Sequence, residues 1–164
     1  MEREFIQLVN DHRGLIFKVC NLYCRDPENR RDLFQEVVLQ LWKSFPGFRK
    51  DSANSTWVYR VALNTAISNF RKESKKPERR SISLDEFEIP DLAGMDDKEK
   101  RSTLKLAIDK LTEIEKAIIM LYLDEKSYDE ISDIVGISVS NVGVRINRIK
   151  NKLSKLIKTD SYEY

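Results

Sequence analysis

The sequence predicts an all-α protein with two small helical domains, a flexible acidic linker between them, and a helix-turn-helix in the C-terminal domain. Apolar residues recur at helical spacing along most of the 164 residues, and no segment alternates with the period of a strand. This periodicity stops between residues 74 and 97. The predicted domains are therefore residues 1–73 and 98–164, with residues 74–97 as the linker. The end of the second domain has the caps, turn and basic helix of a helix-turn-helix.

Composition excludes several classes of protein. The chain is 41% hydrophobic and 34% charged, with five Gly and four Pro, which is typical of a soluble, helix-rich protein. Its first residues, MEREFIQLV, lack the apolar core of a signal peptide, and no apolar run approaches the length of a membrane span. We therefore expect a cytoplasmic protein without membrane insertion.

Residues for catalysis or metal binding are scarce. His12 is the only histidine, and neither a phosphate-binding glycine loop nor an HExxH pattern is present. Cys20 and Cys24 lie four residues apart, on a helix face related to that of His12. These three residues lack a fourth metal ligand, so reduced core thiols are the simpler interpretation. We expect no enzyme activity, no cofactor and no metal site.

Two helices are predicted at the N-terminus. The first, over about residues 3–24, has an apolar stripe in which His12 also lies. Asp26-Pro27-Glu28 combines an N-cap, a proline at the first helical position and an acidic first turn, so it starts a second helix over about residues 27–45. The residues of this helix expected to face the core are Phe34, Val37, Val38, Leu41, Trp42 and Phe45.

The outer face of the second helix is unusual. Asp32, Glu36, Leu39 and Lys43 fall at positions i, i+4, i+7 and i+11, on one line along the helix. A leucine on an outward line of carboxylates indicates a protein-docking surface. A solvated face with one stray leucine is the alternative that this pattern leaves open.

A third helix is predicted over about residues 57–73, with Thr56 as its N-cap. One of its faces carries Arg60, Asn64, Ile67 and Arg71. Trp57 borders this face, and cations beside an exposed ring suit a nucleic-acid backbone and an unstacked base. Packing of Trp57 in the core is the alternative.

Charge is unevenly distributed although the formal net charge is only +2. Residues 56–80 hold seven basic and two acidic residues, whereas residues 81–97 hold six acidic residues and no basic one. Pro77 and Pro90 discourage a continuous helix here. The predicted linker is thus basic at its start and acidic afterwards.

The C-terminal domain is predicted to begin with two helices, over about residues 98–110 and 113–123. Thr112 and Glu115 form a capping box before the second of them, because each side chain satisfies a backbone N–H of the other residue. Residues 159–164 are polar and are expected to fray.

The last two helices of this domain have the pattern of a helix-turn-helix. Ser127 and Glu130 form a capping box, Gly136 ends the first helix, and Ser138 caps the second. The apolar stripe of the second helix comprises Val142, Ile146, Ile149, Leu153 and Ile157. A polar and basic stripe with the same spacing comprises Asn141, Arg145, Arg148, Lys152 and Lys155. This pattern favours DNA binding over an amphipathic hairpin with a solvated lysine face.

Two segments resemble motifs of a known family. DLFQEVVLQLW (Asp32–Trp42) is similar to its D-L-x-Q-E-x-F-x-x-x-W signature, and TWVYRVALNTAISNFRK (Thr56–Lys72) to its W-L-Y-R-I-A-x-N segment. Together with the helix-turn-helix and the short linker, they resemble a bacterial RNA polymerase sigma factor of the extracytoplasmic-function (ECF) type. The resemblance covers about residues 5–73 and 98–158.

The resemblance implies a factor that binds core RNA polymerase and directs promoter recognition and transcription initiation. The N-terminal domain would dock on the largest subunit and would read and melt the downstream promoter element. The C-terminal domain would dock on the second-largest subunit and read the upstream element, while the acidic linker would mimic nucleic acid in the polymerase channel. An anti-sigma factor is a further candidate partner. The alternatives are a stand-alone helix-turn-helix regulator that binds an operator without polymerase, and an interaction protein that does not read DNA.

The resemblance also implies roles for individual residues. Those for polymerase docking are Asp32, Gln35, Glu36 and Leu39. Those for the downstream element are Asn54, Trp57, Arg60, Asn64 and Arg71, with Asn54 and its loop, Lys50–Ser55, taking a flipped base. Those for the upstream element are Ser140, Asn141, Val144, Arg145 and Arg148. Gly143 and Val144 stand where a Lys-Ser pair is common in the family, so upstream reading is expected to rest more on phosphate contacts and DNA shape.

Overall fold

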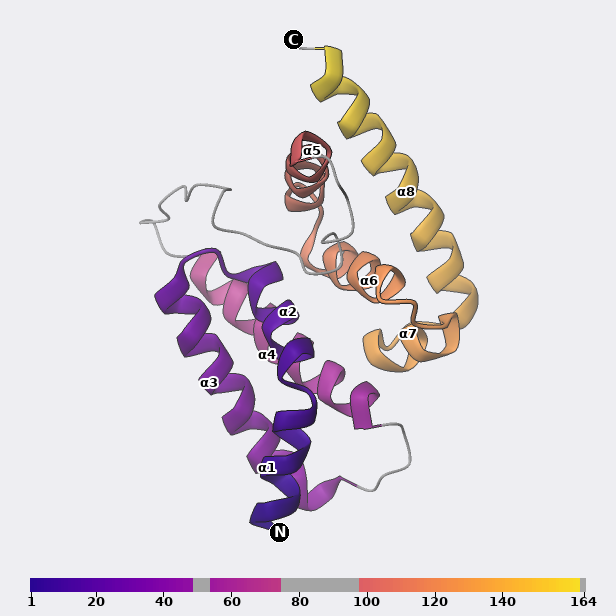
Figure 1. Cartoon of the computed structure of the whole chain (residues 1–164). Coiled ribbons are helices and arrows are strands. Elements are labelled where there is room, and N and C mark those ends of the chain that lie inside the picture. The colour runs from indigo at the N-terminus through magenta and orange to yellow at the C-terminus, as the bar shows by residue number, and fades with distance from the viewer. Residues whose placement is uncertain (49–53, 75–97, 163–164) are drawn as a thin grey trace. The chain divides into compact units, whose positions relative to one another are not determined.

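The computed structural model describes residues 1–48, 54–74 and 98–162 (Figure 1). The chain divides into two compact units, Met1–Glu88 and Ile89–Tyr164, and the division falls within the predicted linker. All regular secondary structure in the described ranges is helical, which confirms the predicted fold class. No helix in these ranges is both long enough and apolar enough to cross a membrane.

The first unit is a bundle in which α2, α3 and α4 pack against one another. Its elements are α1 (Glu2–Asp11), α2 (Arg13–Tyr23), α3 (Pro27–Ser44), the 3-10 turn η1 (Phe45–Gly47) and α4 (Asn54–Ser74). Fully buried side chains from the three packed helices form the core, among them Ile16, Val19, Val37, Leu41, Val58 and Ala62. The ring of Phe5 anchors α1 through edge contacts with Trp42 and Phe45, at centroid distances of 4.9 and 5.5 Å.

The predicted single helix over residues 3–24 is wrong, because the chain breaks at His12. This residue separates α1 from α2 and has φ −117° and ψ 17°. Its Nδ1 atom lies 2.8 Å from the carbonyl oxygen of Leu8, and its own backbone N–H bonds to the same oxygen. A side chain that competes for a local carbonyl weakens a helix, and Gly14 close behind lowers helix propensity further.

The buried side of α3 also differs from the prediction. Leu33, Val37 and Leu41 are the buried residues of this helix. Trp42, which was expected in the core, is 38% exposed. Phe34 is half-buried, and its ring packs against that of Phe17 at a centroid distance of 4.7 Å. The stripe at i, i+4 and i+8 that begins at Leu33 faces α2 and α4, so Trp42 is rotated toward the surface.

Helix α4 begins earlier than predicted. Its first residue is Asn54, so Thr56 lies inside the helix and is not its N-cap. Thr56 is only 3% exposed, which fits a position on the buried side of the first turn.

In the second unit, α8 packs on the three other helices. The elements are α5 (Lys98–Asp109), α6 (Glu113–Leu123), α7 (Tyr128–Val135) and α8 (Val139–Tyr162). Val142, Ile146, Ile149 and Leu153 of the predicted apolar stripe are buried, and Ile157 is half-buried. Helix α8 continues to Tyr162, so it includes four of the six C-terminal residues that were expected to fray.

The local signals of the helix-turn-helix are confirmed. Both capping boxes are present, before α6 and before α7. Gly136 adopts the left-handed conformation, with φ 81°, and the backbone N–H of Asn141 donates to Ser138 Oγ at 3.2 Å. The hydroxyl of Ser132 donates to the carbonyl of Ile137, which ties α7 to the turn.

Alanine substitutions at two glycines are expected to change stability in opposite directions. Gly136 has a positive φ, so Gly136→Ala is expected to lower the free energy of unfolding by about 1 kcal/mol. Gly143 lies within α8, and a Cβ there would meet Tyr128 Cε2 at 3.5 Å, an ordinary contact. Gly143→Ala is therefore expected to raise the free energy of unfolding by up to about 1 kcal/mol. Urea unfolding measures both, and shifts of the same sign would contradict this assignment.

Candidate functional site

Four predicted docking residues lie together on the outward face of α3. Asp26 is the N-cap of this helix, and its carboxylate accepts a hydrogen bond from the backbone N–H of Asn29 at 3.3 Å. Pro27 at its first position favours the helical conformation. The exposed residues at spacing i, i+3, i+4 and i+7 are Asp32, Gln35, Glu36 and Leu39, and Leu39 is 43% exposed. One helix face therefore presents acidic, polar and apolar groups in a line.

Trp42 extends this line, although sequence reasoning assigned it to the core. It follows Leu39 by three residues, which was the available signal, and Phe5 of α1 supports its ring edge-on. At the middle of the line, Glu36 Oε1 accepts a hydrogen bond from Gln40 Nε2 at 2.9 Å. The α3 docking face, defined as Asp32, Gln35, Glu36, Leu39 and Trp42, is thus acidic at its N-terminal end and apolar at its C-terminal end. Such a surface suits a protein partner with basic and apolar groups.

The residues predicted for the downstream element divide into two groups. Asn54, Asn64 and Arg71 are exposed, and Arg60 is half-buried. Arg60, Asn64 and Arg71 share one line along α4 at i, i+4 and i+11. Residues 50–53 of the loop Lys50–Ser55 lie outside the described residues, as do residues 75–97 of the acidic linker.

Trp57 is separate from this polar line. It is 9% exposed, its ring stacks on that of Phe48 at a centroid distance of 4.4 Å, and Phe45 lies 6.4 Å away. Core packing, the alternative left open in the sequence, therefore describes Trp57. Its ring holds Phe45 and Phe48, in and just after η1, against the first turns of α4.

The residues predicted for the upstream element gather on the N-terminal half of α8. Ser140, Asn141, Val144 and Arg148 are exposed, and Arg145 is half-buried. Asn147 is also exposed on this face and was missed by sequence reasoning, although its spacing of three from Val144 was available as a signal. The outward face of α8 is defined as Ser140, Asn141, Val144, Asn147 and Arg148. It can offer hydrogen bonds, one positive charge and one apolar group to DNA.

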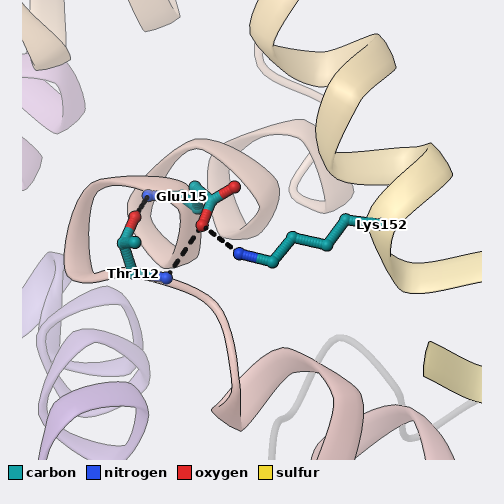
Figure 2. A network of polar contacts seen from close by, with 3 residues as sticks. All are labelled: Thr112, Glu115 and Lys152. Atoms are coloured by element: carbon teal, nitrogen blue, oxygen red, sulfur yellow. Dashed lines mark hydrogen bonds and ion pairs between the residues drawn. The ribbon is translucent and has the colours of Figure 1, made fainter. Parts of the chain in front are cut away.

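Two basic residues of α8 contact side chains of another helix in their own domain. Lys152 Nζ lies 3.0 Å from Glu115 Oε1 of α6 (Figure 2). The same oxygen accepts the backbone N–H of Thr112 at 2.9 Å, so one carboxylate both caps α6 and holds α8. Lys150 Nζ donates to the hydroxyl of Tyr122 at 2.7 Å. The basic surface offered to DNA is therefore smaller than the polar and basic stripe in the sequence.

The carboxyl group of Glu115 makes the stability of this unit depend on pH. Burial raises its pKa, but the hydrogen bond from Thr112 and the charge of Lys152 lower it more, so the net pKa is below the ordinary value of 4.5. A carboxylate with a depressed folded-state pKa stabilises the fold above its unfolded-state pKa and loses that contribution as the pH falls through the folded-state value.

Glu115→Gln is expected to reduce the loss of stability on acidification below about pH 4.5, because the variant has no carboxylate to protonate. Urea unfolding of the variant and the unchanged chain between pH 7 and pH 3 measures the difference. The variant is expected to be less stable at pH 7 and to lose less on acidification. Parallel pH curves would contradict this role for Glu115.

The surroundings of His12, Cys20 and Cys24 bear on whether these residues could bind a metal. No group of three or more metal-ligating residues occurs in the part of the chain that the structure describes. Burial raises the pKa of Cys20 to about 12 and that of Cys24 to about 11. Thiols with such pKa values stay protonated at neutral pH and are poor metal ligands and nucleophiles. This favours the interpretation of reduced core thiols.

Comparisons with known proteins match both units. Residues 8–76 match the family model "Sigma-70 region 2", and residues 101–153 match "Sigma-70, region 4". The ECF RNA polymerase sigma-E factor of Escherichia coli K12 is 32% identical over 143 residues, which cover 77% of this chain and 75% of that protein. The ECF RNA polymerase sigma factor SigW of Bacillus subtilis is 27% identical over 168 residues, covering 94% and 89% of the two chains.

A solved structure shares the fold. It is the sigma factor RpoE of Bartonella quintana, crystallised with the anti-sigma factor NepR. The two chains superpose with a TM-score of 0.73 at 19% sequence identity, and the match covers 96% of this chain and 99% of that one.

Proposed function

This chain belongs to the ECF-type RNA polymerase sigma factors, and we propose that three of its surfaces have separate roles in promoter recognition. These surfaces are the α3 docking face, helix α4 and the outward face of α8. As a member of this family it is not an enzyme, and it binds core RNA polymerase and directs it to promoter DNA. Family membership decides against the stand-alone regulator that the sequence also allowed. The proposal concerns which residues carry each part of this function.

The α3 docking face binds the largest subunit of core polymerase. The observation that carries this assignment is the exposure of Leu39 and Trp42 in line with the carboxylates of Asp32 and Glu36. Apolar side chains gain free energy when a partner covers them, and the carboxylates select a partner with basic groups. The exposed tryptophan is the kind of residue that dominates the energy of protein interfaces.

Helix α4 reads and melts the downstream promoter element. Asn54, exposed at its first position, binds a base that has left the stack, because an amide can both donate to and accept from a base edge. Arg60, Asn64 and Arg71 hold the DNA backbone along the same helix. Trp57 packs in the core and does not itself stack on a base.

The outward face of α8 reads the upstream element from the major groove. The N-terminal half of the second helix of a helix-turn-helix is the part that reaches base edges. Arg148 and Arg145 bring positive charge to the DNA backbone or to guanine, while the Lys152 charge remains paired with Glu115. The second unit as a whole docks on the second-largest polymerase subunit.

An anti-sigma factor is a proposed partner, and the cytoplasm is the proposed location. The similar Bartonella quintana protein was solved with such a partner, and exposed apolar residues of the first unit, including Phe17 at 46%, offer a surface for one. The cytoplasm is where core polymerase meets promoter DNA. Purification of the chain from its native host, followed by identification of the bound proteins, tests the partner.

Reconstituted transcription tests the proposed function. The chain is mixed with core polymerase and a set of promoter fragments, and transcripts are expected only when both proteins are present. Free protein is expected to shift the same fragments only weakly in a gel, because tight binding through both promoter contacts depends on polymerase. If no promoter gave a factor-dependent transcript, the proposal would fail. Binding to polymerase without open complexes would instead favour an interaction protein that does not read DNA.

Asn54→Ala is expected to reduce transcription from a fully paired promoter by about tenfold or more, because capture of a flipped base supplies part of the energy for melting. Transcription from the same promoter with mismatched bases across the melted segment is expected to be nearly unchanged. Asn69→Ala, fifteen residues further along α4, is the control and should resemble the unchanged chain. Equal losses on the paired and mismatched templates would exclude a role in melting.

A further inference from the structure

Val144 lies at the centre of the outward face of α8. Successive residues of a helix are rotated by about 100°, so Val144 points almost directly away from the buried residues Val142 and Ile146. Its side chain is 46% exposed. Its neighbours on this face are polar and exposed, namely Ser140, Asn141, Asn147 and Arg148.

The folded domain gains little from a valine at this position. A β-branched side chain lowers helix propensity, and a half-exposed one buries little apolar surface within the domain. Val144 also has no hydrogen-bonding group to offer to water or to a phosphate. An apolar side chain surrounded by polar ones gains free energy only when a binding partner covers it.

The local packing holds this part of α8 in a defined position. Gly143 carries no side chain, so the ring of Tyr128 from α7 packs beside it, with Cε2 3.5 Å from the position that a Cβ would occupy. Ser138 caps the first turn through the N–H of Asn141. Val144 is therefore presented from a supported helix, which a specific contact requires.

We propose that Val144 contacts the C5-methyl group of one thymine in the upstream promoter element and thereby selects a T·A base pair at that position. Thymine is the base that presents a methyl group in the major groove, and apolar side chains are its usual partners. The inference rests on the proposed function of α8 as the upstream reader. It differs from phosphate and shape readout, because it assigns direct readout to a residue that cannot form a hydrogen bond.

Replacing thymine by uracil tests the contact, since the exchange removes only the methyl group. Each thymine of the upstream element is replaced in turn, on both strands, in a promoter that the reconstituted holoenzyme transcribes. Promoter affinity is measured for holoenzymes that contain the unchanged chain, Val144→Ala or Val139→Ala. Val139 is a matched control, because it is 43% exposed on the same helix but rotated from Val144 by about 140°.

For the unchanged chain, uracil at one position is expected to weaken promoter binding by about three- to tenfold. Val144→Ala should weaken binding to the thymine promoter and should lose most of this sensitivity to uracil, while Val139→Ala should retain it. The inference is overturned if no thymine responds, or if Val144→Ala responds as the unchanged chain does. Scrambling the whole upstream element distinguishes a failure of the Val144 contact from a failure of upstream reading. If scrambling has no effect on promoter binding, α8 does not read the element, and its proposed function as the upstream reader fails together with the inference.

Discussion

Glu36→Arg is expected to lower the affinity of this sigma factor for core RNA polymerase by about 100-fold or more, without changing its helix content or its unfolding transition. Glu36 is exposed at the middle of the α3 docking face, and its partner in the chain is the half-buried Gln40. Reversal of its charge opposes a basic partner surface, and like charges facing each other across an interface cost several kcal/mol. A loss of about 100-fold corresponds to about 2.7 kcal/mol.

Asp11→Arg is the matched control for Glu36→Arg. It makes the same change of net charge at an exposed residue of the same unit, at the C-terminal end of α1. Binding of labelled chain to core polymerase, followed by fluorescence anisotropy, measures both variants, and circular dichroism checks that each is folded. If Glu36→Arg bound as tightly as Asp11→Arg, the assignment of the α3 docking face would be withdrawn.

Arg148→Met and Lys152→Met are expected to have different effects although both remove one positive charge from α8. Arg148 is exposed on the outward face, so its loss is expected to weaken promoter binding by about tenfold or more and to reduce the salt dependence by about one counterion. Lys152 is paired with Glu115, so its loss is expected to lower the free energy of unfolding by up to about 1 kcal/mol while promoter affinity changes by less than about twofold.

Promoter affinity of holoenzymes at several salt concentrations, together with urea unfolding of the free variants, distinguishes the two residues. The Debye length is about 8 Å at physiological ionic strength, so attraction between Lys152 and more distant DNA charges is largely screened. Equal losses of promoter affinity would mean that Lys152 leaves Glu115 when DNA binds. If Arg148→Met left promoter affinity unchanged, Arg148 would no longer be assigned as a DNA contact.

Local sequence signals predicted the second unit well. The capping boxes at Thr112 and Ser127 and the glycine at position 136 act between residues at most four positions apart, so the chain forms these structures wherever it folds. The apolar stripe of α8 follows from a period of 3.6 residues. The exposed line from Asp32 to Leu39 was predictable for the same reason, since one helix brings these residues together.

The sequence misplaced a residue, or left its role open, where burial or pairing depends on a partner that is distant in the sequence. Trp42 has apolar character, but its burial depends on which side of α3 faces α2 and α4. Trp57 is buried because Phe45 and Phe48 reach it from η1 and the residue after it. Lys152 belongs to the polar and basic stripe of α8, but its charge is paired with that of Glu115, which lies 37 residues away in the sequence.

Helix type, the capped helix ends of the second unit and the presence of a basic helix-turn-helix could thus be deduced from the amino-acid sequence, because hydrogen bonds and spacings within one turn of backbone govern them. The packing of the helices decided which aromatic rings are exposed, which cations are available to DNA, and that Val144 stands at the centre of the outward face. Burial and ion pairing depend on which surfaces meet in three dimensions, and no period along a single helix contains that information.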